Sequence, residues 1–172
     1  MSDIGEQFDL GITNIKKITY DNQLQSMIAF GKNLVTNVLP IQAKYPNLTG
    51  NTISSYSFGV YHNGNLIYYG KANVKDAIRN KLTKGEIFSG ISYDGFFVKG
   101  YLATIETDRK YGSETAYQFL NQYRPNTRNF AMVVTTGTEY SAYLENVRHM
   151  NVLTGSIDYV ESNFINSFKP IA

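Results

Sequence analysis

The amino-acid sequence predicts an α+β fold, with an antiparallel β-sheet built from hairpins and covered on one face by a long N-terminal helix and a C-terminal helix. Apolar residues recur every three or four positions over residues 21–39 and again over 157–168, as on the buried face of a helix. Between these segments, two tight-turn signals, Asn63-Gly64 and Asp94-Gly95, each separate two β-prone runs. Strands joined by tight turns pair antiparallel. The length of 172 residues fits a single domain, 1–172.

The first helix is expected to begin at Asp21, a favourable N-cap residue, and to end at Leu39, because Pro40 follows. Its predicted apolar face comprises Leu24, Met27, Ile28, Leu34, Val35 and Val38, with Gly31 on the same side. Residues 1–20 show no clear period and are expected to form an extended arm.

The first hairpin is the strongest short-range signal, because both residues of an Asn-Gly pair accept the positive φ of a type I′ turn. A two-residue turn at this point sets the register of the two strands. It predicts that Val60 pairs with Ile67 and that Phe58 pairs with Tyr69.

Residues 72–128 are expected to form an insertion that contains a short helix, a hairpin and a second helix. The short helix is expected over 71–84, the hairpin strands over 87–93 and 96–104, and the second helix from Ser113 to Tyr123. Arg124-Pro125 is expected to end that helix.

The last third of the chain predicts a strand over Phe130–Thr135 and a final helix that begins near Thr154 or Ser156. The predicted buried face of that helix comprises Ile157, Val160, Phe164, Ile165 and Phe168. Residues 139–147 fit a helix, a strand or a loop.

Composition excludes several classes of function. The absence of cysteine excludes disulfide scaffolds, cysteine-based zinc sites, iron–sulfur clusters and thiol nucleophiles. The only histidines, His62 and His149, are not next to a nucleophile motif such as G-x-S-x-G, and phosphate-loop and dinucleotide motifs are absent. We therefore expect neither an enzyme nor a cofactor. No apolar run is long enough to span a membrane, and the N-terminus does not read as a signal peptide, so synthesis in a cytoplasm is expected.

Three basic residues recur every four positions in the segment expected to form the short helix: Lys71, Lys75 and Arg79. On a helix this spacing brings the three charges to one face, where they would contact DNA phosphates or an acidic partner. The alternative is a solvated helix face.

Two segments together resemble a known family. Tyr45–Ser55 reads Tyr-Pro-Asn-Leu-Thr-Gly-Asn-Thr-Ile-Ser-Ser, and Glu139–Glu145 reads Glu-Tyr-Ser-Ala-Tyr-Leu-Glu before a C-terminal helix. This layout is similar to the tail-completion (neck) proteins of tailed bacteriophages, with their Thr-Gly-x-Leu-x-x-Ser-like and Tyr-Ala-x-Tyr-Val-Glu-like stretches. Thr52 stands where the family favours leucine, Ser141 where it favours alanine, and Asn146 where glycine commonly follows the glutamate.

The resemblance implies a virion structural protein, made in the host cytoplasm. Such a subunit forms a homo-oligomeric ring, usually six- or twelve-fold, in the head–tail connector or upper tail through which DNA passes. Its partners would be portal or adaptor proteins and tail proteins, with possible non-specific contact to DNA. Tyr140, Tyr143 and Glu145 would form a shape-defining turn near a subunit contact. The alternative is another virion or surface interaction module, of the tail, the baseplate or a carbohydrate-binding type.

Overall fold

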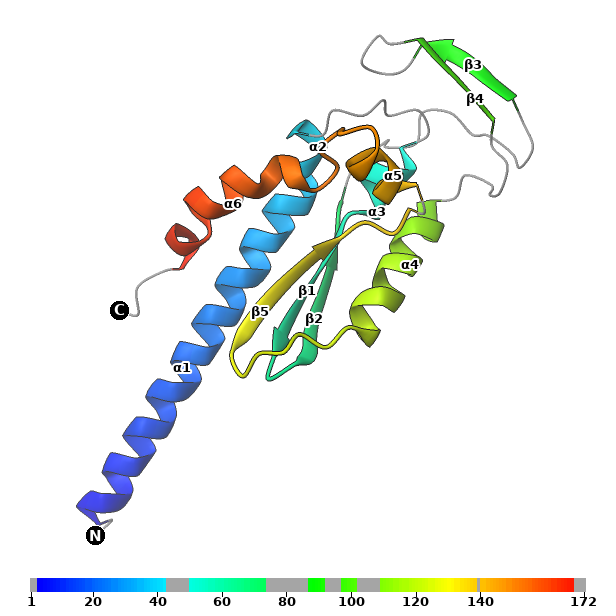
Figure 1. The fold of residues 1–172 in the computed structure, drawn as a ribbon. Coiled ribbons are helices and arrows are strands. Elements are labelled where there is room, and N and C mark those ends of the chain that lie inside the picture. The colour runs from blue at the N-terminus through cyan, green and yellow to red at the C-terminus, as the bar shows by residue number, and fades with distance from the viewer. Residues whose placement is uncertain are drawn as a thin grey trace.

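The computed structural model describes residues 3–42, 50–73, 87–91, 97–101, 109–138 and 140–168. As predicted, the fold is α+β, with a three-stranded antiparallel sheet in the order β2-β1-β5 (Figure 1). The long helix α1 crosses one face of this sheet, and α6 packs beside α1. In chain order the α-helices and strands are α1 (Ile4–Asn33), α2 (Leu39–Gln42), α3 (Asn51–Ser55), β1 (Ser57–His62), β2 (Asn65–Lys71), β3 (Ile87–Ile91), β4 (Phe97–Tyr101), α4 (Arg109–Gln122), β5 (Phe130–Thr135), α5 (Ser141–Asn146) and α6 (Ile157–Asn163).

The extended arm expected over residues 1–20 is wrong for its described part, because α1 is one continuous helix from Ile4. Asp3 occupies the N-cap position, where its side chain accepts a hydrogen bond from the Gly5 N–H at 3.4 Å. Asp21, expected to be the cap, therefore lies inside the helix. The first half of α1 projects beyond the body of the protein (Figure 1), so no core contact marks it in the sequence.

Pro40 does not end the helical segment as expected. A π-helical stretch, Leu34–Val38, follows α1 directly and leads into α2, which contains the proline. Proline lacks an N–H, and its ring collides with the carbonyl four residues earlier in a regular α-helix. The wider π turn, in which Leu39 donates to the Leu34 carbonyl, accommodates that ring.

The first hairpin has the predicted turn, with φ of 51° at Asn63 and 76° at Gly64. The predicted register holds only next to that turn. A β-bulge between Val60 and Tyr61 shifts the remaining pairs by one residue. The predicted partners of Val60 and Phe58 are therefore wrong.

The shifted register brings Phe58 opposite Gly70, and Val60 opposite Tyr68. The Phe58 ring then lies between two glycines, Gly70 of β2 and Gly31 of α1. A Cβ added to Gly31 would lie 2.8 Å from Cζ of the ring, and one added to Gly70 would lie 2.5 Å from the same atom. Both distances are too short for real contacts, so both positions require glycine.

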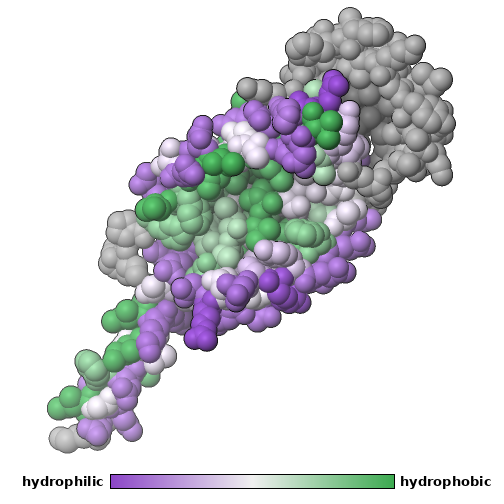
Figure 2. Space-filling model, in the orientation of Figure 1, coloured by the Kyte–Doolittle hydropathy of each residue, from purple (hydrophilic) through white to green (hydrophobic). Residues whose placement is uncertain are grey.

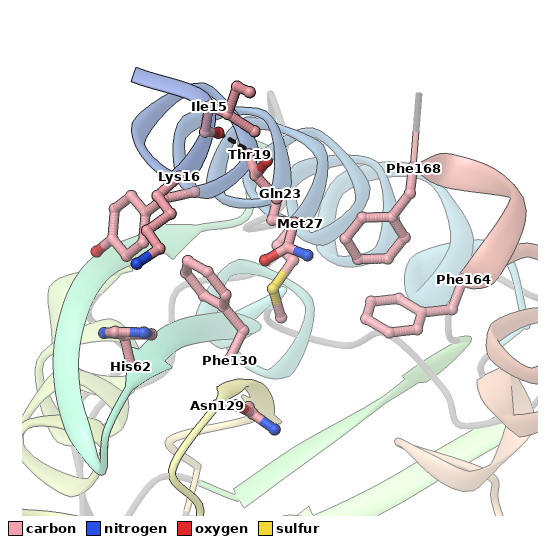
Figure 3. A pocket seen from close by; sticks show the side chains of 11 residues that line it. Ile15, Lys16, Thr19, Gln23, Met27, His62, Asn129, Phe130, Phe164 and Phe168 are labelled. Atoms are coloured by element: carbon pink, nitrogen blue, oxygen red, sulfur yellow. Dashed lines mark hydrogen bonds between the residues drawn. The ribbon is translucent and has the colours of Figure 1, made fainter. Parts of the chain in front are cut away.

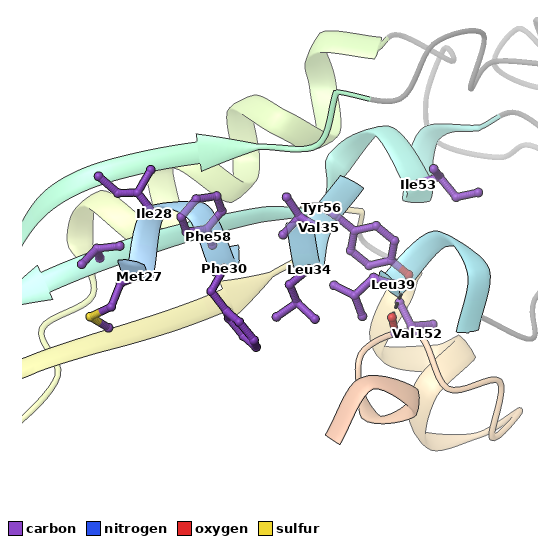
Figure 4. Packing of buried hydrophobic residues seen from close by; sticks show 11 residues of the cluster. Met27, Ile28, Phe30, Leu34, Val35, Leu39, Ile53, Tyr56, Phe58 and Val152 are labelled. Carbon is purple, nitrogen blue, oxygen red and sulfur yellow. Dashed lines mark hydrogen bonds between the residues drawn. The ribbon is translucent and has the colours of Figure 1, made fainter. Parts of the chain in front are cut away.

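The hydrophobic core lies between α1 and the sheet and closes against the loop that precedes α6 (Figure 4). The Tyr56 hydroxyl donates to the Val152 carbonyl at 2.7 Å, which ties this loop to the start of β1. The buried residues of the cluster are Met27, Ile28, Phe30, Leu34, Val35, Leu39, Ile53, Tyr56, Phe58, Val60 and Val152.

The second face of the sheet is covered by α4, a layer that the sequence prediction did not include. The Tyr61 hydroxyl donates to the Leu120 carbonyl at 2.6 Å, and Ala116 and Leu120 are buried against the sheet. The helix begins at Arg109, so Ser113, the expected cap, lies within it. It ends before Arg124-Pro125 as predicted.

The second predicted hairpin is present as the antiparallel pair β3 and β4, and β5 has the predicted bounds. At the C-terminus, Val160, Phe164 and Phe168 pack on the core as predicted. Ile157 and Ile165 are exposed instead. Tyr159 takes their place, since its ring stacks on Phe30 and its hydroxyl accepts a hydrogen bond from Asn33 Nδ2 at 2.8 Å.

Replacing Gly31 by alanine is expected to lower the free energy of unfolding by about 1–3 kcal/mol, because the new methyl group overlaps the Phe58 ring. Gly11→Ala in the same helix is the matched control. Its Cβ would meet nothing within 4 Å, so it is expected to stabilise by up to about 1 kcal/mol through helix propensity. Urea denaturation followed by circular dichroism measures both. Equal stabilities for the two variants would contradict the close packing described here.

Candidate functional site

The structure separates the three residues that were expected to act together at a subunit contact. Tyr143 lies in α5, and Tyr140 immediately precedes this helix. Their side chains face solvent, with exposed fractions of 52% and 38%. Glu145, also in α5, is half-buried and bonds to its own chain. The two tyrosines are therefore available to a partner, while Glu145 acts within its own chain.

The Glu145 carboxylate organises the loop that leads into α6. It accepts hydrogen bonds from the backbone N–H of Leu153 at 2.9 Å and of Thr154 at 3.2 Å, and also from the Thr154 hydroxyl. These groups begin the short 3-10 turn Thr154–Ser156 that precedes α6. One carboxylate thus satisfies donors that the turn leaves open.

The pKa of Glu145 reflects this arrangement. Partial burial raises the pKa of Glu145. The hydrogen bonds from the Thr154 hydroxyl and from the backbone of Leu153 and Thr154 lower the pKa, and together they outweigh the effect of burial, so that the pKa lies below the usual 4.5. The side chain is therefore charged at neutral pH, as a carboxylate that holds a turn must be.

A cluster of buried hydroxyl groups joins the two segments that carry the family resemblance. Thr52 and Ser55 come from α3, in the first segment, and Ser141 comes from α5, in the second. Thr138 shares hydrogen bonds with both segments, with Thr52 at 3.4 Å and with the Ser141 hydroxyl. Ser55 and Thr136 add a bond of 2.6 Å. Through Thr138, which lies 86 residues after Thr52, these polar contacts hold the two segments together.

The backbone approaches closely beside this cluster. A Cβ on Gly137 would overlap the backbone of Gly112 in α4, and a Cβ on Gly112 would lie 2.5 Å from the Ser55 Cβ. An open cavity of about 300 Å³ adjoins the hydroxyl cluster and is lined by Thr136, Ser141 and Glu145 among others. Because these polar groups already bond to one another or to the loop before α6, the cavity has the character of a structural junction.

The expected basic face does not form as predicted, because Lys71 is the exposed last residue of strand β2. In a strand, side chains follow a period of two, so Lys71 does not continue a helical row. Lys75 and Arg79 lie outside the described residues.

The two histidines occupy different environments. The ring of His62 packs against Tyr20 with centroids 5.0 Å apart and against Phe130 at 4.8 Å, which is a structural role. His149 is exposed in the loop after α5, with φ of 51°. Over the part of the chain that the structure describes, no group of three or more histidine or acidic side chains could hold a metal ion.

The structure reveals one surface that the sequence interpretation missed. Along the projecting half of α1, Ile4, Phe8, Ile15 and Ile18 are exposed by 84%, 69%, 63% and 54%. These residues follow the three- and four-residue spacing of a helical face, and Gly11 occupies the remaining position. We call this set the arm stripe. A search for helical period over residues 4–18 would have found it.

Comparisons with protein families, with curated proteins and with solved structures found no match to this chain. Among the described residues, no helix combines the length and the apolar character needed to cross a lipid bilayer.

Glu145→Gln is expected to lower the free energy of unfolding by about 1 kcal/mol at pH 7, because hydrogen bonds to a half-buried charge are weakened. The folded-state pKa is depressed, so the contribution is present above the usual pKa of 4.5 and is lost as the pH falls through the lower folded value. The difference between the parent and the variant should therefore shrink in acid. Thermal unfolding from pH 7 to pH 3 measures it, with the exposed Glu161→Gln on α6 as the control. A difference that does not change with pH would contradict this role.

Proposed function

We propose that this chain is a virion structural protein of a tailed bacteriophage, a ring-forming subunit of the head–tail connector or upper tail through which DNA passes. The observation that carries the assembly part of this proposal is the arm stripe. It places four large apolar side chains on a helix that projects into solvent. Exposed apolar surface of this extent and continuity is typical of protein interaction sites.

Support for the family part comes from the hydroxyl cluster. The two segments that resemble the tail-completion proteins are far apart in the chain but meet in the fold. Thr52 and Ser141, which depart from the family pattern, both bond to Thr138. Two apolar positions of the pattern are thus replaced together by two hydroxyl groups that share one partner, which favours a common architecture.

In this proposal the exposed rings of Tyr140 and Tyr143 face a neighbouring subunit, and Glu145 maintains the shape of the segment that presents them. Tyrosine suits such a contact because its ring offers apolar area and its hydroxyl offers a hydrogen bond. Lys71, Lys75 and Arg79 remain the proposed DNA- or partner-facing basic residues, as a local excess of charge and not as one helical face.

The proposal predicts a discrete assembly of the purified full chain, with a mass six or twelve times 19.4 kDa. Light scattering across a concentration series measures the mass, and negative-stain electron microscopy shows whether the particles are rings with a lumen. Antibodies against the chain should label virions of its phage at the junction of head and tail. Labelling of tail tips or fibres, together with saturable binding to a glycan array, would favour the alternative interaction module and contradict the connector.

A further inference from the structure

An apolar groove of about 590 Å³ opens at the base of the projecting helix (Figure 3). Met27 of α1 forms one wall, and Phe164 and Phe168, which follow α6, form the other, with their rings edge to face at 5.2 Å. Phe130 of β5 and His62 of β1 line the groove below α1. Figure 2 shows apolar residues gathered on this face of the molecule and again along the projecting part of α1.

The charges of the groove and of the helix tip are complementary. The ionisable groups that line the groove are Lys16, His62 and Tyr20, and no carboxylate is among the lining residues. The tip of α1, from residue 3 to 15, carries Asp3, Glu6 and Asp9 and no basic residue. An acidic apolar helix therefore suits an apolar groove that is lined by one lysine, Lys16, and by no carboxylate.

The tip cannot reach the groove of its own chain. The wall of the groove and the tip belong to one continuous helix, α1. Ile4 lies eleven residues before Ile15, which borders the groove, and this separation is about 16 Å along the axis, directed away from the body. The helix would have to break for the tip to fold back. An occupant with this sequence must come from another molecule.

We propose that the groove receives the N-terminal tip of α1 from a second copy of this chain, with Phe8 and Ile4 packed against the partly exposed rings of Phe130, Phe164 and Phe168. The inference deepens the proposed function and rests on its assembly of identical copies. Each side chain of the stripe offers on the order of 100 Å², so that a single contact is smaller than the roughly 1,200–2,000 Å² of stable interfaces and is weak by itself. Because every chain carries both a tip and a groove, contacts repeat around a closed assembly and reinforce one another.

The first test compares two charge insertions on the tip. Phe8→Glu places a carboxylate in the apolar contact and should weaken self-association by at least about a hundredfold. Leu10→Glu is the matched control, because Leu10 is 66% exposed but lies about 200° around the helix from Phe8. Both side chains are exposed in the single chain, so both variants should fold like the parent by circular dichroism. Sedimentation equilibrium measures the association constants.

The second test identifies the contact itself. The chain has no cysteine, so single cysteines can be introduced without background. A mixture of Phe8→Cys chains with Asn129→Cys chains should form a mixed disulfide under mild oxidation, because Asn129 lines the groove. A mixture of Leu10→Cys with Asn129→Cys chains should form much less of it.

The outcomes separate this inference from the proposed function. Loss of association in Phe8→Glu together with the mixed disulfide supports the tip in the groove. Oligomers that persist in Phe8→Glu, or disulfides formed mainly between two Phe8→Cys chains, overturn the inference while leaving assembly intact. A parent chain that stays monomeric at every concentration overturns the self-docking contact, whereas the labelling of virions decides the connector separately.

Discussion

The arrangement of this protein depends on the packing of one ring, that of Phe58, between Gly31 of α1 and Gly70 of β2. The ring is fully buried and sets how closely the helix approaches the sheet. A side chain at either glycine would push the two layers apart or displace the ring. Since α1 is continuous from Ile4 to Asn33, the same contact also sets the direction in which the helix leaves the body, and with it the position of the groove.

The sequence predicts the hairpin that contains Phe58, but it does not predict that Phe58 lies opposite Gly70. The Asn-Gly turn determines only the pairs next to it, and the bulge after Val60 depends on packing with elements distant in the chain. The element that covers the second face of the sheet escapes prediction for a related reason. The aromatic residues of the hairpin indicate that both faces are at least half covered, but they do not say that the helix α4 covers the Tyr61 side and gives the Tyr61 hydroxyl a buried acceptor. Turns and the periodicity of apolar residues can thus be predicted from the sequence. Which helix packs on which face of the sheet cannot be predicted in this way.

The candidate site shows that a spacing argument holds only for the secondary structure it assumes. The spacing of the basic residues predicts that Lys71 begins a row along a helix, but Lys71 is the last residue of strand β2. Tyr140, Tyr143 and Glu145 are close together in the sequence and were expected to act at one contact. The Glu145 carboxylate points into the fold instead, because it accepts hydrogen bonds from the backbone N–H groups of the loop before α6. The arm stripe was missed although its residues have helical spacing. Gly11 leaves a gap between the apolar residues, and no core residue in the same segment indicates a helix.

The length of α1 makes its packing important for the proposed assembly. Ile4 lies 27 residues before Gly31, which is about 40 Å along the helix. A change of about 5° in the tilt of the helix would move the tip by about 3 Å, which is enough to misplace Phe8 in a groove of this size. Close packing at Gly31 therefore does more than stabilise the core, because it aims a rigid helix before any partner is met. In the proposed docking of the tip onto a second copy, such preorganisation would lower the entropy lost on association, and a small apolar contact would then suffice to join the two chains.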